Sequence, residues 1–196
     1  DDEHFRGSIH VQTSDKFNGC DIVSEASLED YISTLLGKEM NSKWPIEALK
    51  AQAVAARSYA YFKIKTKQVS KVAGFNTFYD LENSEKHQVN GSYFDVTKNT
   101  LLAAQSTRGE ILFQTDGSLS PIFFHSKCGG KTLTPEQVWK NPVKGYVSVE
   151  CPFCHNHGME NWNNKITSID WSRAIQRSLI KYNKVENARG PYKVLR

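Results

Sequence analysis

The sequence predicts an α+β fold in which a central, buried, alanine-rich helix packs against antiparallel strands, with a further helix near the C-terminus. Two observations predict this class. Helical patterns occupy the first third of the chain, and β-rich runs separated by a turn signal occupy the middle. The 196 residues are enough for one domain with a sizeable core. We therefore expect a single domain over residues 1–196, with a helical extension at 158–196.

Several helices are predicted from periodicity and capping. At about 26–36 the apolar residues share one helical face, with Ser27 as a suitable N-cap and Asp30 three residues later. Thr97 is the expected cap of a helix at 97–106, and an apolar stripe predicts another helix at about 168–182. A capping-box pattern beginning at Thr134 predicts a short helix through Trp139.

A β-hairpin is predicted between the helices expected at 97–106 and 134–139. The runs EILFQ (110–114) and LSPIFFHS (119–126) are rich in strand-forming residues, and they flank Thr115–Ser118. Asp-Gly between two such runs is a strong hairpin signal. Pro121 cannot donate to a ladder, so the second run is expected to be an edge strand or to contain a bulge.

The stretch WPIEALKAQAVAARSYAYFK (44–63) predicts a long helix from Pro45 to about Lys65. Proline is tolerated at the first helical position because its missing N–H has no intrahelical partner there. Two adjacent stripes of this helix, 46/49/53/56/60 and 48/52/55/59, consist mainly of small or apolar residues. We therefore expect the helix to be buried and closely approached by other parts of the backbone.

Glu47 is the one carboxylate in this stretch. One interpretation is electrostatic, because an acid in the first turn is favoured by the helix dipole. The other is chemical: apolar walls formed by Trp44, Pro45 and Ile46 would disfavour ionisation, and such a carboxyl group can act as a general acid. Arg57 and Gln52 also stand where the helix pattern favours small apolar residues, and each is expected to have either a structural partner or a ligand.

Composition excludes several classes of protein. Hydrophobic residues at 39% and charged residues at 23% are ordinary for a globular chain, and no apolar run approaches the roughly 20 residues of a membrane span. The 25 basic and 21 acidic residues are scattered and form no basic face of the kind that binds nucleic acid. We expect no membrane span, no nucleic-acid partner and a monomer. Because the chain begins with Asp1 rather than Met, we expect that an upstream segment has been removed, either by a signal peptidase or by design.

Four blocks occur in order: LEDYISTLLGKEMNSKWPIEALKAQAVAARSYA (28–60), YDLENSEKHQVN (79–90), TRGEIL (107–112), and PIFFHSKCGGKT followed by VWKNPVKGYVSV (121–149). They resemble the SpoIID/LytB family, the sporulation stage II protein D type of peptidoglycan lytic enzyme. The resemblance covers roughly residues 28–150, and the EALKAQAVAAR run is highly specific. It implies a secreted or periplasmic protein whose partner is the peptidoglycan glycan strand.

The resemblance implies that Glu47 is the catalytic glutamate. It would protonate the glycosidic oxygen and then, as a carboxylate, take the proton of the muramyl 6-hydroxyl as that oxygen attacks the anomeric carbon. Hydrolysis would instead need a water and usually a second carboxylate, for which Asp80, Glu82 and Asp116 are candidates. Lytic transglycosylase or lysozyme-type muramidase, and acetylated or deacetylated substrate, remain open. The alternative is a catalytically inactive cell-wall-binding or regulatory module of the same fold.

The resemblance also implies a set of positions that line the substrate groove, for which core hydrogen bonding or capping is an equal alternative. These positions are Gln52, Arg57, Tyr59, Gln88, His125 and Ser126. Some family members hold zinc through cysteine and histidine in the 79–90 block. Here Glu82 and His87 stand where that pattern places cysteines, so we do not expect that local zinc site.

Four cysteines raise a separate question about metal. Cys151 and Cys154 have the spacing of a zinc knuckle, and Cys128 adds a third thiol. The fourth ligand would be His157, with His155 and Cys20 as alternatives. The sequence therefore predicts a structural zinc held by Cys128, Cys151, Cys154 and His157, and no cofactor for catalysis. Two disulfides are the main rival interpretation, and a redox CxxC pair is a further one.

Overall fold

The computed structural model describes residues 7–13, 19–66, 71–72, 75–76, 79–84, 87–153, 165 and 167–181. The chain divides into two compact units, each described by itself below. The first comprises Asp1–Ser126 with Leu133–Ser148, and the second comprises Lys127–Thr132 with Val149–Arg196. The second unit contains the C-terminal helix that the sequence predicts as an extension.

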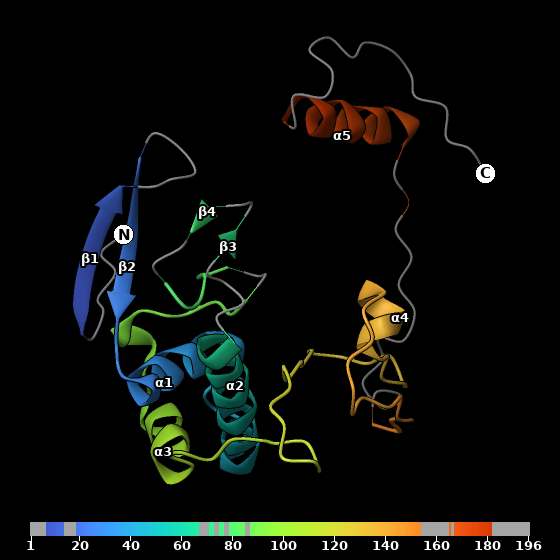
Figure 1. Ribbon diagram of the computed structural model, residues 1–196. Coiled ribbons are helices and arrows are strands. Elements are labelled where there is room, and N and C mark those ends of the chain that lie inside the picture. The colour runs from blue at the N-terminus through green and yellow to red at the C-terminus, as the bar shows by residue number, and fades with distance from the viewer. Residues whose placement is uncertain are drawn as a thin grey trace. The chain divides into compact units, whose positions relative to one another are not determined.

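The first unit combines helices with small antiparallel sheets, which confirms the α+β class (Figure 1). Its elements are β1 (Ser8–Thr13), β2 (Cys20–Glu25), α1 (Leu28–Glu39), α2 (Ile46–Thr66), β3 (Lys71–Val72), β4 (Phe75–Asn76), the 3-10 helix η1 (Tyr93–Asp95), α3 (Lys98–Ser106) and α4 (Pro135–Trp139). β1 pairs with β2 so that Val11 lies opposite Ile22, and β3 pairs with β4.

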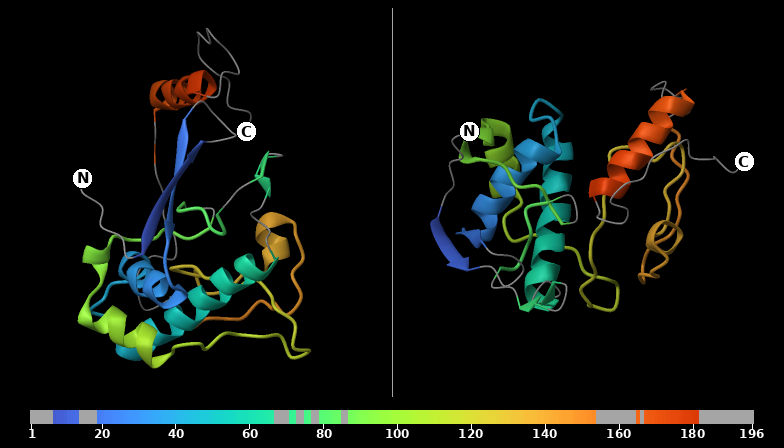
Figure 2. Two further views of the ribbon diagram at one scale, coloured as in Figure 1. Left: turned by 60° about the vertical axis from the view of Figure 1, so that its left-hand side comes forward. Right: turned by 90° about the horizontal axis from the view of Figure 1, so that it is seen from above.

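The core of this unit lies where α1, α2 and α3 pack against one another (Figure 2). Large apolar side chains of α1 meet small ones of α2 and α3. The buried set is Ile32, Leu35, Leu36, Leu49, Ala53, Ala56, Ala103 and Ala104. Small residues at a helix contact let the two axes approach closely. The buried alanine-rich helix is thus confirmed, although among the described elements its partners are helices rather than the expected strands.

The predicted helix caps are present. The Ser27 side chain accepts a hydrogen bond from the backbone of the first turn of α1, and Thr97 does the same for α3. At α4 a reciprocal capping box joins Thr134 and Gln137. These caps satisfy N–H groups that have no intrahelical partner, and they explain why the helix starts could be predicted closely.

A close backbone approach fixes α1 against the segment that precedes α3. A Cβ atom at Gly37 would lie 2.4 Å from the carbonyl oxygen of Asp95, and one at Gly91 would lie 2.8 Å from that of Thr34. Real Cβ atoms do not approach this closely, so both positions need glycine. The segment around η1 is therefore held against α1 on both sides of Ser92.

The hairpin predicted around 115–118 is wrong as a pair of strands. The turn is present, since Gln114 N–H donates to the Ser118 carbonyl, but no strand occurs in the described run 110–126. Backbone N–H groups that could pair the two predicted strands bond to side chains instead. Leu112 N–H donates to Ser58 Oγ, and Phe123 N–H donates to the Tyr146 hydroxyl. Side chains from α2 and from the 133–148 segment therefore replace the strand partner.

The second unit is described over 127–132, 149–153, 165 and 167–181. Lys131 and Glu150 form an antiparallel bridge, and Cys151 N–H donates to the Gly130 carbonyl at 2.8 Å. Helix α5 spans Ser168–Lys181 and confirms the predicted C-terminal helix. Among the described helices of the whole chain, none has the length and apolar character that crossing a membrane requires.

Candidate active site

Glu47 lies in the first turn of α2 and is open to solvent. Its side chain is 78% exposed, and its Oε1 accepts a hydrogen bond from Lys50 Nζ at 2.8 Å. The expected desolvation by apolar walls is therefore absent, because Trp44 and Pro45 are themselves exposed and Ile46 is half-buried. An exposed ion pair is screened by water, so a ligand can displace Lys50 from this carboxylate.

Arg57 is buried and fully paired in this fold, which favours the structural alternative over a place in a substrate groove. The side chain is 1% exposed and pairs with Glu29 through both carboxylate oxygens, at 3.1 and 2.8 Å. The other three guanidinium N–H groups donate to Thr107 Oγ1 and to the carbonyls of Ala104 and Glu110. A guanidinium has five N–H donors, so none remains for a substrate.

Gln88 also belongs to the core rather than to a groove. It is 3% exposed, its side-chain oxygen accepts from the Tyr31 hydroxyl at 3.0 Å, and its Nε2 donates to the Ala56 carbonyl. This pair of contacts joins α1 to α2. Burial, with the charge of Glu39 as a smaller cause, raises the pKa of Tyr31, so its hydroxyl stays a donor.

Gln52 and Tyr59 share a face of α2 that differs from the face of Glu47. Five residues separate Glu47 from Gln52, which is roughly 140° around a helix axis. Gln52 Nε2 is buried without a hydrogen-bond partner in the described part of the chain. Tyr59 is buried, which raises its pKa, and its ring lies 6.4 Å from that of Phe123. These two residues are thus not brought together with Glu47.

His125 and Ser126 are exposed at the end of the extended run 121–126. Across the described residues, no hydrogen bond or ion pair joins Glu47 to another member of the predicted groove; its partner is Lys50. The structure therefore separates the predicted set into an exposed part, Glu47 with His125 and Ser126, and a buried part.

The candidates for a second carboxylate have other surroundings. The hydrogen bond from Lys144, with those from Ser118, lowers the pKa of Asp116 to about 2, so this carboxylate stays ionised. It stabilises the 115–118 turn. Glu82 is half-buried, and its backbone N–H donates to His87 Nδ1 at 3.0 Å. That bond occupies one ring nitrogen of His87.

Comparison with known proteins decides the family. The family model described as Stage II sporulation protein matches residues 16–113, which is half of the chain and includes Glu47. The chain belongs to the SpoIID family. The groove positions up to Gln88 lie within the matched SpoIID segment, whereas His125 and Ser126 lie beyond it.

Three curated relatives of this SpoIID chain are longer than the chain itself. An uncharacterized protein of Brachyspira hyodysenteriae is 34% identical over 146 residues, covering 74% of this chain and 38% of its own length. The amidase enhancer of Bacillus subtilis is 34% identical over 109 residues, covering 56% and 13%. Stage II sporulation protein D of Bacillus subtilis is 30% identical over 139 residues, covering 67% and 40%. The chain thus spans two fifths or less of each of these relatives.

The predicted metal site is described in part. Cys128 and Cys151 are half-buried in the second unit, on the two segments that the Lys131–Glu150 bridge joins. Cys154 and His157 lie outside the described residues. Among the residues that are described, no group of three or more His, Cys, Asp or Glu side chains is arranged to hold a metal ion.

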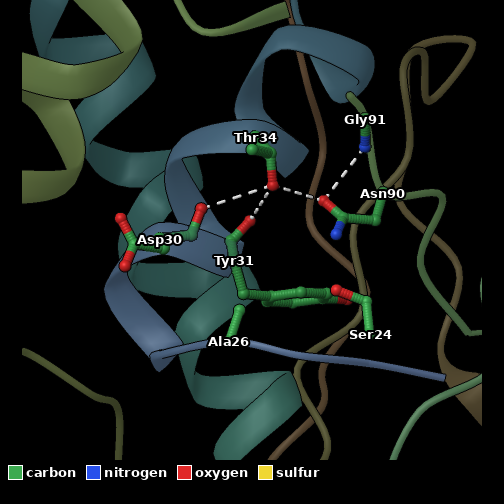
Figure 3. Close-up of a pocket in the computed structure, with 7 residues that line it drawn as sticks. All are labelled: Ser24, Ala26, Asp30, Tyr31, Thr34, Asn90 and Gly91. Carbon is green, nitrogen blue, oxygen red and sulfur yellow. Dashed lines mark hydrogen bonds between the residues drawn. The ribbon is translucent and has the colours of Figure 1, made fainter. Parts of the chain in front are cut away.

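A small hollow lies between α1, the end of β2 and the segment at 90–91 (Figure 3). Thr34 Oγ1 donates to Asn90 Oδ1 at 2.6 Å, and Gly91 N–H donates to the same oxygen. The free space is about that of one water molecule. The hollow is therefore part of the contact between α1 and this segment, and it does not include Glu47.

Sequence reasoning missed an aromatic cluster in the first unit. The Phe123 ring lies 4.9 Å from that of Trp139 and 5.7 Å from that of Tyr146. A signal was available, because all three lie in the sequence blocks that resemble the SpoIID family. The helical and strand patterns carried the sequence argument instead, and they say nothing of contacts between segments far apart in the chain.

Proposed function

We propose that this chain cleaves peptidoglycan glycan strands, as a lytic transglycosylase or a lysozyme-type muramidase, with Glu47 as its general acid and base. One observation carries the proposal: Glu47 lies in the segment that matches the SpoIID family, and its carboxylate is accessible. Arg57, the other charged residue predicted for the groove, is buried and fully paired. The relatives named for sporulation and for amidase enhancement support a role at the cell wall.

The chemistry needs one group that gives and regains a proton. The Glu47 carboxyl transfers its proton to the glycosidic oxygen as the bond to the anomeric carbon breaks. The muramyl 6-oxygen then bonds to that carbon, and its proton returns to the Glu47 carboxylate. Bound glycan would displace Lys50 and exclude water, and both changes favour the protonated carboxyl. Trp44, 53% exposed and three residues away in sequence, offers an apolar surface for the sugar.

The second candidate is a cell-wall-binding or regulatory module without catalysis. The observation that favours it is the 78% exposure of Glu47 in an ion pair with Lys50, since a general acid usually needs a less hydrated site. A module of this kind would bind peptidoglycan whether or not residue 47 is an acid.

Digestion of purified peptidoglycan separates the two candidates. We expect soluble fragments from the unaltered protein and, since general acid–base catalysis contributes about 10²–10⁴-fold, a rate at least about hundredfold lower for Glu47→Gln. Glu136→Gln is the matched control, because Glu136 is an exposed acid in the first turn of α4. Equal rates for Glu47→Gln would overturn the catalytic role. Binding without fragments would establish the module.

Mass spectrometry of the fragments refines the reaction and the substrate. Anhydro ends identify a transglycosylase, whereas reducing ends identify hydrolysis and would require a water-activating group. Acetylated and deacetylated walls digested in parallel determine the substrate preference. The location that the proposal requires is extracytoplasmic, secreted or periplasmic.

We also propose that the second unit holds a structural zinc through Cys128, Cys151, Cys154 and His157. The bridge between 131 and 150 supports this, because it joins the segments of the first two thiols. We expect one zinc per chain by elemental analysis, retained in Cys20→Ser and lost in Cys151→Ser. Cys20 is a suitable control because it is an exposed thiol of the first unit. Metal-free protein with two disulfides by mass spectrometry would overturn the zinc assignment.

A further inference from the structure

The aromatic cluster of the first unit holds one indole in a fixed place. Trp139 is the last residue of α4, and its ring contacts Phe123, which in turn contacts Tyr59 and Tyr146. The Tyr146 hydroxyl donates to the Pro121 carbonyl at 2.7 Å and accepts from Phe123 N–H at 2.9 Å. Burial raises the pKa of Tyr146, so this hydroxyl remains protonated and both bonds persist.

The backbone around Trp139 is fixed at both ends of α4. The Thr134–Gln137 capping box sets the start of the helix, and Lys140 ends it in the left-handed conformation at φ 64°. Lys140 is the one non-glycine residue with positive φ in the described part of the chain. A side chain other than glycine or asparagine is uncommon in this conformation. Trp139 is therefore held between two constrained backbone positions.

This supported indole is nonetheless half open to solvent. Trp139 is 54% exposed, although its ring lies 4.9 Å from Phe123. Val138 and Leu133, close by in sequence, are 49% and 58% exposed. A single exposed apolar residue is ordinary, but a large ring that is rigid, packed on one side and open on the other supplies contact area at low entropic cost.

We propose that Trp139 is a stacking platform for a sugar ring of the glycan. The proposal rests on the proposed function for its ligand class. The C–H face of a pyranose is apolar and slightly positive, and it matches the negative face of an indole. Tryptophan is also the best aromatic partner for a cation, so a glucosamine with a free amine gains a second attraction.

Two soluble probes test the platform: chitotetraose, which is fully acetylated, and its deacetylated counterpart. With ¹⁵N-labelled protein, we expect the indole N–H signal of Trp139, assigned by its loss in Trp139→Ala, to shift on addition of the tetrasaccharide. Calorimetry should give an affinity that is weaker by up to about tenfold for Trp139→Ala. The matched control is Trp171→Ala, which removes a tryptophan that is 41% exposed on α5 and should bind as the unaltered protein does.

A second variant separates the platform from simple unfolding. Tyr146→Phe keeps the ring and removes the two hydroxyl bonds, so it should bind the tetrasaccharide more weakly than the unaltered protein and less weakly than Trp139→Ala. Trp139→Ala binding both sugars as tightly as the unaltered protein, or no shift of the Trp139 signal with either sugar, would overturn the platform. Glu47→Gln should retain sugar binding. If the unaltered protein binds the tetrasaccharide but releases no fragments from peptidoglycan, the catalytic proposal fails and the platform stands.

Discussion

Two charged residues of α2 have opposite environments. The Arg57 side chain is 1% exposed and makes five hydrogen bonds, whereas the Glu47 side chain is 78% exposed and has one partner. Ten residues separate them, or roughly 15 Å along the helix. In the sequence both interrupt the same alanine-rich pattern. A charge within such a pattern is therefore not by itself a sign of a site, and what packs over it decides its role.

The difference follows from the groups that lie beside each residue. Arg57 lies where the N-terminal end of α1 and the C-terminal end of α3 meet α2, and there its guanidinium binds the Glu29 carboxylate and the carbonyls of Ala104 and Glu110. Carbonyls at the end of a helix have no intrahelical donor, so a guanidinium is well suited to them. Glu47 lies in the first turn of α2, where Trp44 and Ala51 are also exposed.

We expect the largest loss of stability from a substitution of the buried Arg57. Arg57→Met should lower the free energy of unfolding by about 3–5 kcal/mol, because it leaves the Glu29 carboxylate without its partner. Urea denaturation followed by circular dichroism measures the change. Arg108→Met is the control, since Arg108 is exposed. A loss no larger than that of the control would mean that Arg57 is not the structural residue described above.

The second prediction compares a buried and an exposed alanine of α2. Ala53→Leu should destabilise the fold by about 1–3 kcal/mol, because Ala53 is fully buried against α1 and α3 and a larger side chain overpacks that contact. Ala51→Leu, two residues away on the exposed side, should change stability by less than about 0.5 kcal/mol. Similar values for the two variants would contradict the assignment of the buried face.

A pH series tests the polar contact that joins α1 to α2. The pKa of Tyr31 is raised above its ordinary value of 10.0 in the folded state, chiefly by burial. Its contribution to stability is thus complete below pH 10 and is lost as the pH rises above it, by up to about 1.4 kcal/mol per pH unit. Thermal unfolding between pH 8 and 11 measures this slope. Tyr31→Phe should reduce the slope, and an unchanged slope would exclude Tyr31 as its source.

The smallest effect concerns the exposed end of α2. Lys50→Met removes the partner of Glu47, yet an exposed ion pair contributes little, so stability should change by less than about 0.5 kcal/mol. Denaturation at low and high salt provides the measurement, and the small difference should shrink further as salt screens the pair. A loss above about 1 kcal/mol would show that this turn is more tightly organised than its exposure indicates.

The helices of the first unit could be predicted because their signals are local. Ser27, Thr97 and Thr134 cap helices that begin one residue later, as their side chains require. The run 110–126 was wrongly predicted to form strands. The backbone N–H groups of Leu112 and Phe123 bond to Ser58 and to the Tyr146 hydroxyl, and both partners are distant in sequence. β propensity identified an extended chain there, but not what it bonds to.

The candidate site was harder to predict than the fold. The resemblance identified Glu47, whose exposure agrees with access to a polymer but not with the expected desolvation. It also included Arg57 and Gln88, which are core residues. Family positions mix residues needed for folding with residues needed for chemistry, and only burial and hydrogen bonding separate them. No sequence pattern singles out Trp139, because its proposed role depends on contacts with Phe123 and, through it, Tyr146.

The glycine contact between α1 and the segment before α3 also bears on where the chain could be lengthened. The chain leaves the core at the end of α2 and is secured again at Gln88 and Gly91. With both ends of that stretch secured, each doubling of its length costs only about 0.6 kcal/mol in closure entropy. We therefore expect a short insertion between Thr66 and Gln88 to leave the three-helix packing undisturbed.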